Sequence, residues 1–208
     1  MTSLRARRWV RLGFAGATGA GLGSAVFWAH YLLTIVSGNL KGPDFYSFYS
    51  GAKLFVTRGG SAVYDLALQR EIQVQVTSQP PDRFIVLPYF HPPFYTLLIA
   101  PLGYLSYRQA YIAMGAFNVM LAAALIVLLI RSSLRIHGRA AVVAAALIAG
   151  FFPLFVTSLQ GQSDLVVLVP LAAPSFAWAR GLLAWAGIFP ALATPKPPAL
   201  LLFPGVCL

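Results

Sequence analysis

Long apolar stretches alternate with short polar turns over most of this chain. The first stretch, residues 12–36, follows four arginines and is long enough to cross a hydrocarbon core of about 30 Å. It predicts an uncleaved membrane helix, although a cleaved signal peptide has the same basic start and small residues. Pro170 and Pro174 are expected to kink one of the later helices. The later stretches predict spans at residues 110–130, 140–156, 165–179 and 182–202.

Residues 37–108 have a mixed composition that differs from these spans. Apolar positions recur at helical spacing in residues 45–55 and 63–76, with a glycine pair between them. They predict two short amphipathic helices in the membrane interface. Residues 78–82 predict a turn. Residues 89–107 have an apolar core that is too short to span and contains a proline, so we expect a re-entrant or interfacial helix there.

Composition places the chain among the integral membrane proteins. Of its 208 residues, 59% are hydrophobic and only 10% are charged, whereas a soluble domain carries roughly 25% charged residues. The net charge of +10 does not indicate nucleic-acid binding, because the basic residues lie between apolar stretches, where they set membrane topology. The predicted fold is therefore all-α, a polytopic bundle of about five transmembrane helices that forms a single membrane domain over residues 1–208.

The basic residues also predict an orientation. If residues 89–107 do not span, the N-terminal arginines and those at positions 131, 135 and 139 all lie on the cytoplasmic side, as the positive-inside rule prefers. The N-terminus is then cytoplasmic, and polar chemistry is expected at the opposite, non-cytoplasmic face. The acidic residues that fall on that face are Asp44, Asp65, Glu71, Asp82 and Asp164.

Asp44 is the most informative of these acids. It lies just past the first apolar stretch, and four aromatic residues occupy the next five positions. An ionised group at a membrane boundary suggests a functional site, and this carboxylate could accept a proton from a hydroxyl. The alternative is that Asp44 caps an interfacial helix beside an aromatic belt.

Three further polar features lie on the same predicted side. Gln160, Gln162 and Asp164 lie between two spans, where a hydrated turn is the simpler interpretation. Lys196 stands in a proline-broken apolar stretch and could offset the charge of a phosphate, or only reach the membrane interface. His91 precedes two prolines and could donate a hydrogen bond or a proton, or only occupy a turn.

The sequence excludes several common kinds of site. The single cysteine, Cys207, rules out an intrachain disulfide and a thiolate metal site, and the three histidines are too scattered for a metal cluster. No glycine-rich phosphate loop and no nucleophile elbow occur. We therefore expect neither a metal nor a cofactor.

Five short segments, taken in order, form a pattern that covers most of the chain from its first acid onward. They are Asp44-Phe45 with Phe48-Tyr49-Ser50-Gly51-Ala52; Gly60 with Val63-Tyr64-Asp65; Pro88-Tyr89-Phe90-His91-Pro92-Pro93 with Pro101-Leu102; Gly161-Gln162-Ser163-Asp164; and Gly187 to Ala193 with Lys196-Pro197. Their order and spacing resemble glycosyltransferase family 87, polyprenol-phosphate-dependent membrane enzymes that include mannosyltransferases. Asp164 stands where this family more often has asparagine.

The resemblance implies a C-type glycosyltransferase fold with its active site at the outer face. It implies transfer of a hexose, commonly mannose, from a polyprenyl-phosphate sugar to a hydroxyl of a lipid or glycan acceptor, with inversion at the sugar carbon. Asp44 would be the general base, no metal would be needed, and the enzyme would contact membrane lipids in a bacterial plasma membrane. The residues expected to bind substrate are Tyr49, Lys53, Tyr64, Asp65, His91, Gln160, Gln162, Asp164 and Lys196.

The chain is shorter than is usual for this family, and we expect it to be a truncated form, incomplete at its C-terminus. The alternative function is a non-enzymatic membrane protein, such as a transporter half or a scaffold, which the broken helices near Pro170, Pro174 and Lys196 would suit. Transporters often place ionisable groups within spans, whereas the acids of this chain lie in loops or at span ends. The enzyme is therefore the favoured prediction.

Overall fold

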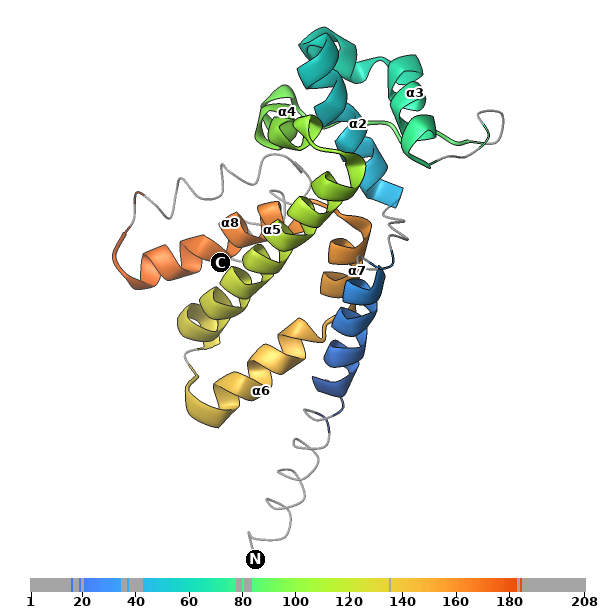
Figure 1. Ribbon diagram of the computed structural model, residues 1–208. Coiled ribbons are helices and arrows are strands. Elements are labelled where there is room, and N and C mark those ends of the chain that lie inside the picture. Colours follow the sequence, from blue (N-terminus) through green and yellow to red (C-terminus); the bar gives the residue numbers. More distant parts are fainter. Residues whose placement is uncertain are drawn as a thin grey trace, which may run out of the picture.

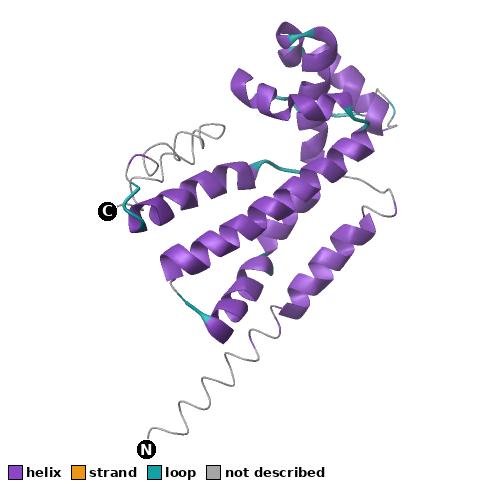
Figure 2. Ribbon diagram, turned by 60° about the vertical axis from the view of Figure 1, so that its left-hand side comes forward, coloured by secondary structure: helices purple, strands orange, loops and turns teal. Residues whose placement is uncertain are grey.

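The computed structural model describes residues 21–34, 43–77, 84–134 and 136–182, together with the single positions 16, 19, 37, 80 and 184. Within these ranges every regular element is a helix and no strand occurs, as Figure 2 shows. The all-α prediction is confirmed for this part of the chain. In Figure 1 the helices of residues 43–104 form a lobe at one end of the later helices.

The lobe begins with two helices joined by a tight connection. α2 (Pro43–Arg58) and α3 (Leu66–Thr77) flank the 3₁₀ helix η1 (Gly60–Tyr64). Gly59 follows α2 with a φ of 88°, a backbone conformation that residues with a Cβ rarely adopt. These are the two helices that the apolar spacing predicts, and their place in the membrane interface stays a prediction. α2 is not a free surface helix, because Phe45 on it is fully buried.

An extended segment, residues 84–92, leads into two more short helices, α4 (Pro93–Ile99) and η2 (Ala100–Tyr104). Each has a proline in its first turn, where the missing N–H removes no helical hydrogen bond. With seven and five residues, neither helix is long enough to cross a membrane. No spanning helix therefore forms in residues 89–107, as expected. The predicted turn at residues 78–82 falls mostly outside the described residues.

The longest helix, α5 (Tyr107–Leu128), runs away from the lobe in Figure 1. A capping box fixes its start, because the side chains of Ser106 and Gln109 each accept a hydrogen bond from the backbone N–H of the other. A π-helical turn, η3 (Leu129–Leu134), continues it. Among the described residues, Tyr107–Arg131 is the one straight helix that is long and apolar enough to cross a membrane.

The span predicted at residues 140–156 is not one continuous helix, because two helices occupy this part of the chain. α6 (Gly138–Ala149) and α7 (Phe152–Gln160) are bent by 50° at their junction. The break has a local cause, because Gly150 ends α6 and Pro153 lies in the first turn of α7. A proline inside a continuous helix would lack an N–H and clash with the carbonyl four residues earlier. α7 then continues beyond the predicted end of the span.

α8 (Asp164–Ala179) agrees with the helix predicted at residues 165–179. It contains Pro170 and Pro174 and packs against α5. The predicted bundle of about five spans is not confirmed. The described residues supply one clear span, or two if the bent α6–α7 pair counts as one. Residues 21–34 of the span predicted at 12–36 are helical, and the ends of that span fall mostly outside the described residues. Nearly all of the span predicted at residues 182–202 lies outside them.

A large cluster of buried side chains, many of them aromatic, lies at the junction between the lobe and the later helices. Phe45 of α2, Tyr95 of α4 and Tyr111 of α5 are all buried there. The rings of Phe45 and Tyr111 meet edge to face with centroids 5.5 Å apart. Such a pair contributes about 0.5–1.5 kcal/mol beyond the burial of its area. This junction therefore holds the lobe at a defined place on α5.

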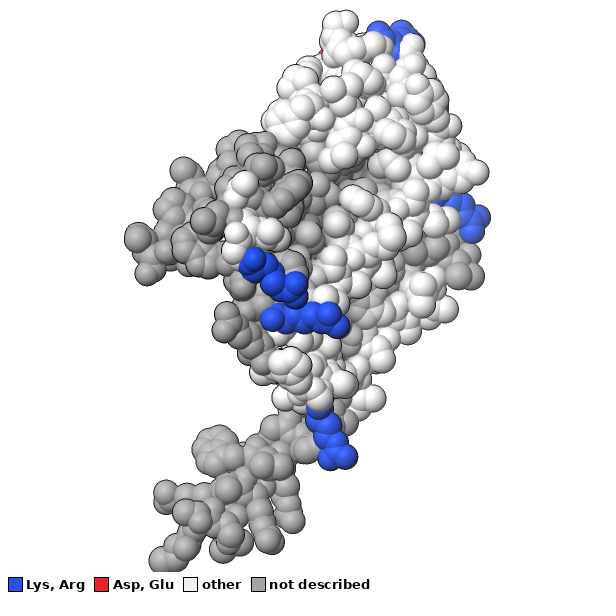
Figure 3. Space-filling view, turned by 90° about the vertical axis from the view of Figure 1, so that its left-hand side faces the viewer, with Lys and Arg blue, Asp and Glu red and all other residues white. Residues whose placement is uncertain are grey.

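The surface away from this junction is largely apolar. Figure 3 shows one face with almost no acidic atoms and with basic side chains only in separate places. Large apolar side chains are well exposed on several helices, among them Leu98, Met120 and Val142. Exposed apolar surface on this scale is typical of helices that face lipid or a partner.

Candidate active site

A pocket of about 270 Å³ opens where the lobe meets the turn between α7 and α8. Its walls come from α2, from the extended segment and from that turn, three parts of the chain that are far apart in sequence. The lining residues are Asp44, Ser47, Phe48, Leu87, Pro88, Phe90, His91 and Gln162. Three of the residues predicted from sequence, Asp44, His91 and Gln162, thus share one pocket.

The carboxylate of Asp44 lies in the first turn of α2, where the helix dipole favours a negative charge. Its Oδ2 atom accepts a hydrogen bond from Nε2 of Gln162. Its Oδ1 atom has no hydrogen-bond partner among the described residues. A carboxylate oxygen can accept more than one hydrogen bond, so Asp44 is able to bind a hydroxyl that enters the pocket.

Gln162 is fixed through both its side chain and its backbone. Its Nε2 atom also donates to Oε1 of Gln160, at 2.8 Å. Its backbone N–H donates to the carbonyl of Thr157 at 2.9 Å, and its own carbonyl accepts from Nδ2 of Asn118 at 3.0 Å. The amide is therefore presented to Asp44 in one orientation.

Gly161 explains how the α7–α8 turn comes so close to α2. It ends α7 in the left-handed conformation, with φ 66° and ψ 31°. A Cβ atom on Gly161 would lie 2.8 Å from Cβ of Phe45, closer than carbon atoms normally approach. A residue without a side chain lets the turn press against α2, and this contact brings Gln162 alongside Asp44.

His91 is held at the pocket by aromatic neighbours. Its ring stacks on Phe48 with centroids 4.9 Å apart and lies 5.0 Å from the ring of Tyr95. Its backbone carbonyl accepts a hydrogen bond from the hydroxyl of Tyr64 at 2.7 Å. The imidazole is therefore a fixed part of the wall, within the same pocket as the carboxylate of Asp44.

The family model of glycosyltransferase family 87 matches residues 89–207, more than half of the chain. The chain belongs to glycosyltransferase family 87. Family membership assigns it to the glycosyltransferases, and its long apolar helix fits the membrane association typical of this family. Neither a curated protein nor a solved structure matches the chain. The matched region of this family 87 protein includes His91 and Gln162, whereas Asp44 precedes it.

Four other residues predicted to bind substrate in this family 87 protein make contacts that build the lobe. The Tyr49 hydroxyl and the Lys53 ammonium donate to backbone carbonyls in or beside η2, at 3.0 and 3.1 Å. Burial raises the pKa of Tyr49, so its hydroxyl stays a donor. Asp65 caps α3 by accepting from two backbone N–H groups at 2.9 and 3.1 Å. The hydroxyl of Tyr64 contacts the pocket wall, because it donates a hydrogen bond to the backbone carbonyl of His91. Their roles in substrate binding stay predictions.

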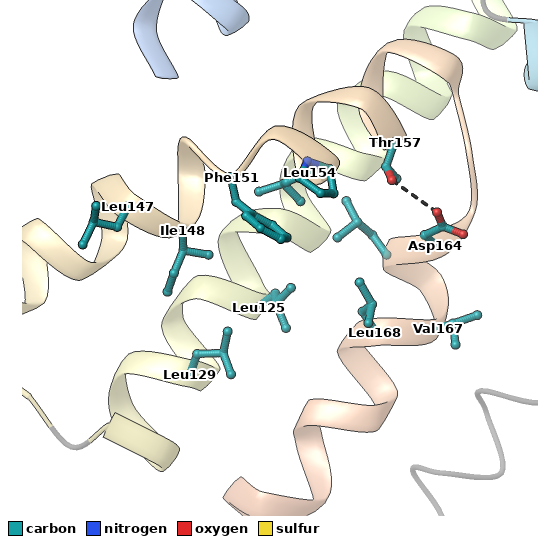
Figure 4. A pocket seen from close by; sticks show the side chains of 12 residues that line it. Leu125, Leu129, Leu147, Ile148, Phe151, Leu154, Thr157, Asp164, Val167 and Leu168 are labelled. Atoms are coloured by element: carbon teal, nitrogen blue, oxygen red, sulfur yellow. Dashed lines mark hydrogen bonds between the residues drawn. The ribbon is translucent and has the colours of Figure 1, made fainter. Parts of the chain in front are cut away.

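Asp164 lines a second and larger cavity. This cavity of about 660 Å³ is bounded by α5, α6, α7 and α8, and Figure 4 shows that its side chains are mostly aliphatic and aromatic. Oδ2 of Asp164 accepts a hydrogen bond from Oγ1 of Thr157 at 3.2 Å at one end of it. Gln160 is connected to the Asp44 pocket by the hydrogen bond that its Oε1 atom accepts from Gln162. Lys196 lies outside the described residues.

The chemistry that the Asp44 pocket offers is proton acceptance by one carboxylate and hydrogen bonding by His91 and Gln162. Across the described ranges, no group of three or more His, Cys, Asp or Glu side chains is placed to hold a metal ion.

Sequence reasoning missed three amides that support this pocket. Asn118 is fully buried in the otherwise apolar middle of α5, and an isolated polar side chain within a span is a signal that could have found it. Gln69 and Gln73 lie one helical turn apart on the buried face of α3, a pattern that is also readable from sequence. All three bind backbone groups of residues that line the pocket or neighbour them.

Proposed function

We propose that this chain is a membrane glycosyltransferase that transfers a hexose, with mannose as the favoured sugar, from a polyprenyl-phosphate donor to a hydroxyl of a lipid or glycan acceptor. Asp44 is the general base. The reaction takes place at the non-cytoplasmic face of a multi-pass protein of the bacterial plasma membrane, with a cytoplasmic N-terminus. The observation that supports this most directly is a pocket, in a family 87 chain, that is lined by Asp44, whose Oδ1 atom has no hydrogen-bond partner among the described residues.

The proposed reaction is a single displacement. The acceptor oxygen forms a bond to the anomeric carbon of the sugar while the bond from that carbon to the phosphate oxygen breaks. The hydroxyl proton passes to Oδ1 of Asp44, and the polyprenyl phosphate leaves with the bonding electrons. Because base and leaving group lie on opposite faces of the sugar, the configuration inverts. A positioned base of this kind accelerates a reaction by about 10²–10⁴-fold.

The neighbours of Asp44 have supporting roles in this proposal. The amide of Gln162 fixes the carboxylate through Oδ2 and leaves Oδ1 for the acceptor. His91 donates a hydrogen bond to the acceptor or to an oxygen of the phosphate. Lys196, in the matched part of the chain, offsets the phosphate charge as a point cation.

The orientation of the site is supported by its distance from Arg131, which follows α5. Asn118 on α5 binds the pocket residue Gln162, whereas Arg131 lies about 20 Å further along the same axis at a rise of 1.5 Å per residue. The pocket and this arginine are thus separated by much of the thickness of a hydrocarbon core. Since arginines favour the cytoplasmic end of a span, this separation favours a non-cytoplasmic pocket.

Glycosyl transfer in membranes from cells that express the gene tests the proposal. With a labelled polyprenyl-phosphate mannose as donor, we expect Asp44→Asn to lower the rate about 10²-fold or more, because the amide cannot accept the proton. Glu71→Gln is the matched control, an acid-to-amide change at an exposed position of α3 outside the pocket. It should transfer at the wild-type rate.

Two outcomes would contradict this proposal. Transfer by Asp44→Asn at the rate of Glu71→Gln would remove Asp44 as the base. Movement of the intact lipid-linked sugar across the membrane, with no covalent transfer by the wild-type protein, would favour the transporter alternative.

A further inference from the structure

The extended segment at residues 84–92 is bound by side chains instead of by another strand. It belongs to no helix and no sheet, yet its backbone is paired at alternate residues. The N–H of Leu87 donates to Oε1 of Gln73 at 3.0 Å, and Nε2 of Gln73 donates to the Leu87 carbonyl at 2.8 Å. The N–H of Tyr89 donates to Oε1 of Gln69 at 2.7 Å, and Nε2 of Gln69 donates to the Tyr89 carbonyl at 3.4 Å.

The geometry of a helix and that of an extended chain make this pairing possible. Gln69 and Gln73 are four residues apart, so both project from one face of α3. Leu87 and Tyr89 are two residues apart, so their backbone groups point to the same side of an extended chain. Each amide supplies one acceptor and one donor to one residue, as the neighbouring strand of an antiparallel pair would. Pro88, which has no N–H to donate, is the residue between them.

The Nε2 atom of each glutamine donates a second hydrogen bond, and the segment also receives a hydrogen bond from α2. Nε2 of Gln73 also donates to Oγ of Ser50 at 3.1 Å, and Nε2 of Gln69 also donates to the Val63 carbonyl at 2.8 Å. From α2, the hydroxyl of Ser47 donates to the carbonyl of Pro88 at 3.0 Å. The segment is therefore held from two sides.

Close packing adds to these hydrogen bonds. A Cβ atom on Gly51 of α2 would lie 2.8 Å from the ring of Tyr89, so the absence of a side chain there lets the ring lie directly on the helix. The hydroxyl of Tyr89 is in turn hydrogen-bonded to Thr96 at 2.9 Å. Burial raises the pKa of Tyr89, which keeps this hydroxyl protonated.

We propose that Gln69 and Gln73 are positioning residues of the Asp44 pocket, which fix the wall that carries Phe90 and His91 by binding the backbone just before it. The structural part of this proposal stands on the hydrogen bonds alone, and its meaning for catalysis rests on the proposed function. Phe90 and His91 follow directly after Tyr89, so any movement of the paired residues moves them relative to Asp44.

A role in packing alone would not require amides at these two positions. Both side chains are fully buried, and burying an amide without hydrogen bonds costs about 1–3 kcal/mol in proteins. A helix face used only for packing is filled by apolar side chains without that cost. Two buried glutamines with matched partners therefore indicate recognition of a particular backbone segment.

Hydrogen exchange of the protein in detergent or nanodiscs tests the pairing. In the wild-type protein, the amides of Leu87 and Tyr89 should exchange at least tenfold more slowly than those of residues 84–86, although the whole segment lacks helix and sheet. In Gln73→Met, which keeps the length and shape of the side chain without its polar atoms, the Leu87 amide should exchange at least tenfold faster. Exchange in α5 should not change.

Gln75→Met is the matched control, because Gln75 lies on α3 two residues away and is exposed. It should leave the exchange of residues 84–92 as in the wild type. Unprotected amides at Leu87 and Tyr89 in the wild-type protein would overturn the proposal, and this measurement needs no variant to fold. Equal exchange of the segment in Gln73→Met and Gln75→Met would also overturn it.

Chemical modification of histidine tests the link to the pocket wall without any assay of activity. His91 should react with diethylpyrocarbonate several-fold faster in Gln69→Met and Gln73→Met than in the wild type, because its ring loses its fixed place on Phe48. His137 is an exposed internal control whose rate should stay constant. Unchanged reactivity of His91 in both variants would show that the amides do not position the wall.

The two proposals can fail separately. If glycosyl transfer is measurable, both glutamine variants should raise the KM for the acceptor more than they lower kcat, because the chemistry at Asp44 is untouched. A protein without transfer activity, but with the exchange and histidine results described, would contradict the proposed function and leave the positioning role in place. Wild-type KM and kcat values in both variants of an active enzyme would overturn the catalytic part of the positioning proposal.

Discussion

Replacing Gly161 by alanine should loosen the contact that brings Gln162 to Asp44. Two costs add at this position. The left-handed backbone, with φ 66°, costs a residue with a Cβ about 1–2 kcal/mol. The added methyl would also lie 2.8 Å from Cβ of Phe45, and overpacking of this kind costs about 1–3 kcal/mol. The expected loss of unfolding free energy is therefore about 2–5 kcal/mol.

Gly138 provides a control that separates the two costs. It also has a positive φ, 61°, but a Cβ there would meet no atom within 4 Å. Gly138→Ala should therefore show the backbone cost without the contact cost. Thermal unfolding followed by tryptophan fluorescence should place the Tm of Gly161→Ala about 2–12 °C below that of Gly138→Ala, at 2–4 °C per kcal/mol for a chain of this size.

The same pair of variants tests the connection to the site. Glycosyl transfer should fall in Gly161→Ala even at temperatures where the protein stays folded, because the turn that carries Gln162 must move away from α2. Gly138→Ala lies far from the pocket and should retain its rate. If both variants have the same Tm and the same transfer rate, the close contact between Gly161 and Phe45 does not hold the site together, and the reasoning is wrong.

Two further predictions concern the lobe and the orientation. Asp65→Ala should lower the unfolding free energy by about 1 kcal/mol, because two N–H groups of α3 lose their acceptor, and hydrogen exchange should quicken first in that turn. An unchanged exchange rate there would contradict the capping role. Cysteines placed singly at Ser61 and Ser133, in a background without the native cysteine, should be labelled from opposite sides of the membrane. Labelling of both from one side would overturn the proposed topology and with it the non-cytoplasmic site.

The helices were largely predictable because their cause is local. A spacing of 3–4 residues between apolar positions decides which face is buried, so the lobe helices and α5 lie close to where the pattern predicts them. The bend between α6 and α7 has a local cause as well. Gly150 and Pro153 lie within an apolar stretch. Hydropathy alone does not show that Gly150 ends one helix and that Pro153 lies in the first turn of the next.

The pocket was only partly predictable because its contacts join distant parts of the chain. Asp44, His91 and Gln162 are chemically distinctive residues, and residue type alone selected them. The hydrogen bond between Asp44 and Gln162 joins residues 118 positions apart, and it depends on a backbone conformation at Gly161 that no periodicity encodes. Lys53 and Asp65 were selected for the same chemical reasons, and their charges prove to be engaged in holding η2 and α3.

Asn118 shows which signal in the sequence would have located the α7–α8 turn. A polar group inside a span is costly unless it is paired, so an amide kept there must have a partner. Met114 and Ala122, one helical turn before and after it, are apolar and buried, which places the amide on the packed face of α5. Its partner must therefore come from another part of the protein and not from lipid or water. The Gly161–Asp164 segment is a polar stretch between two later spans, and it supplies this partner through the carbonyl of Gln162.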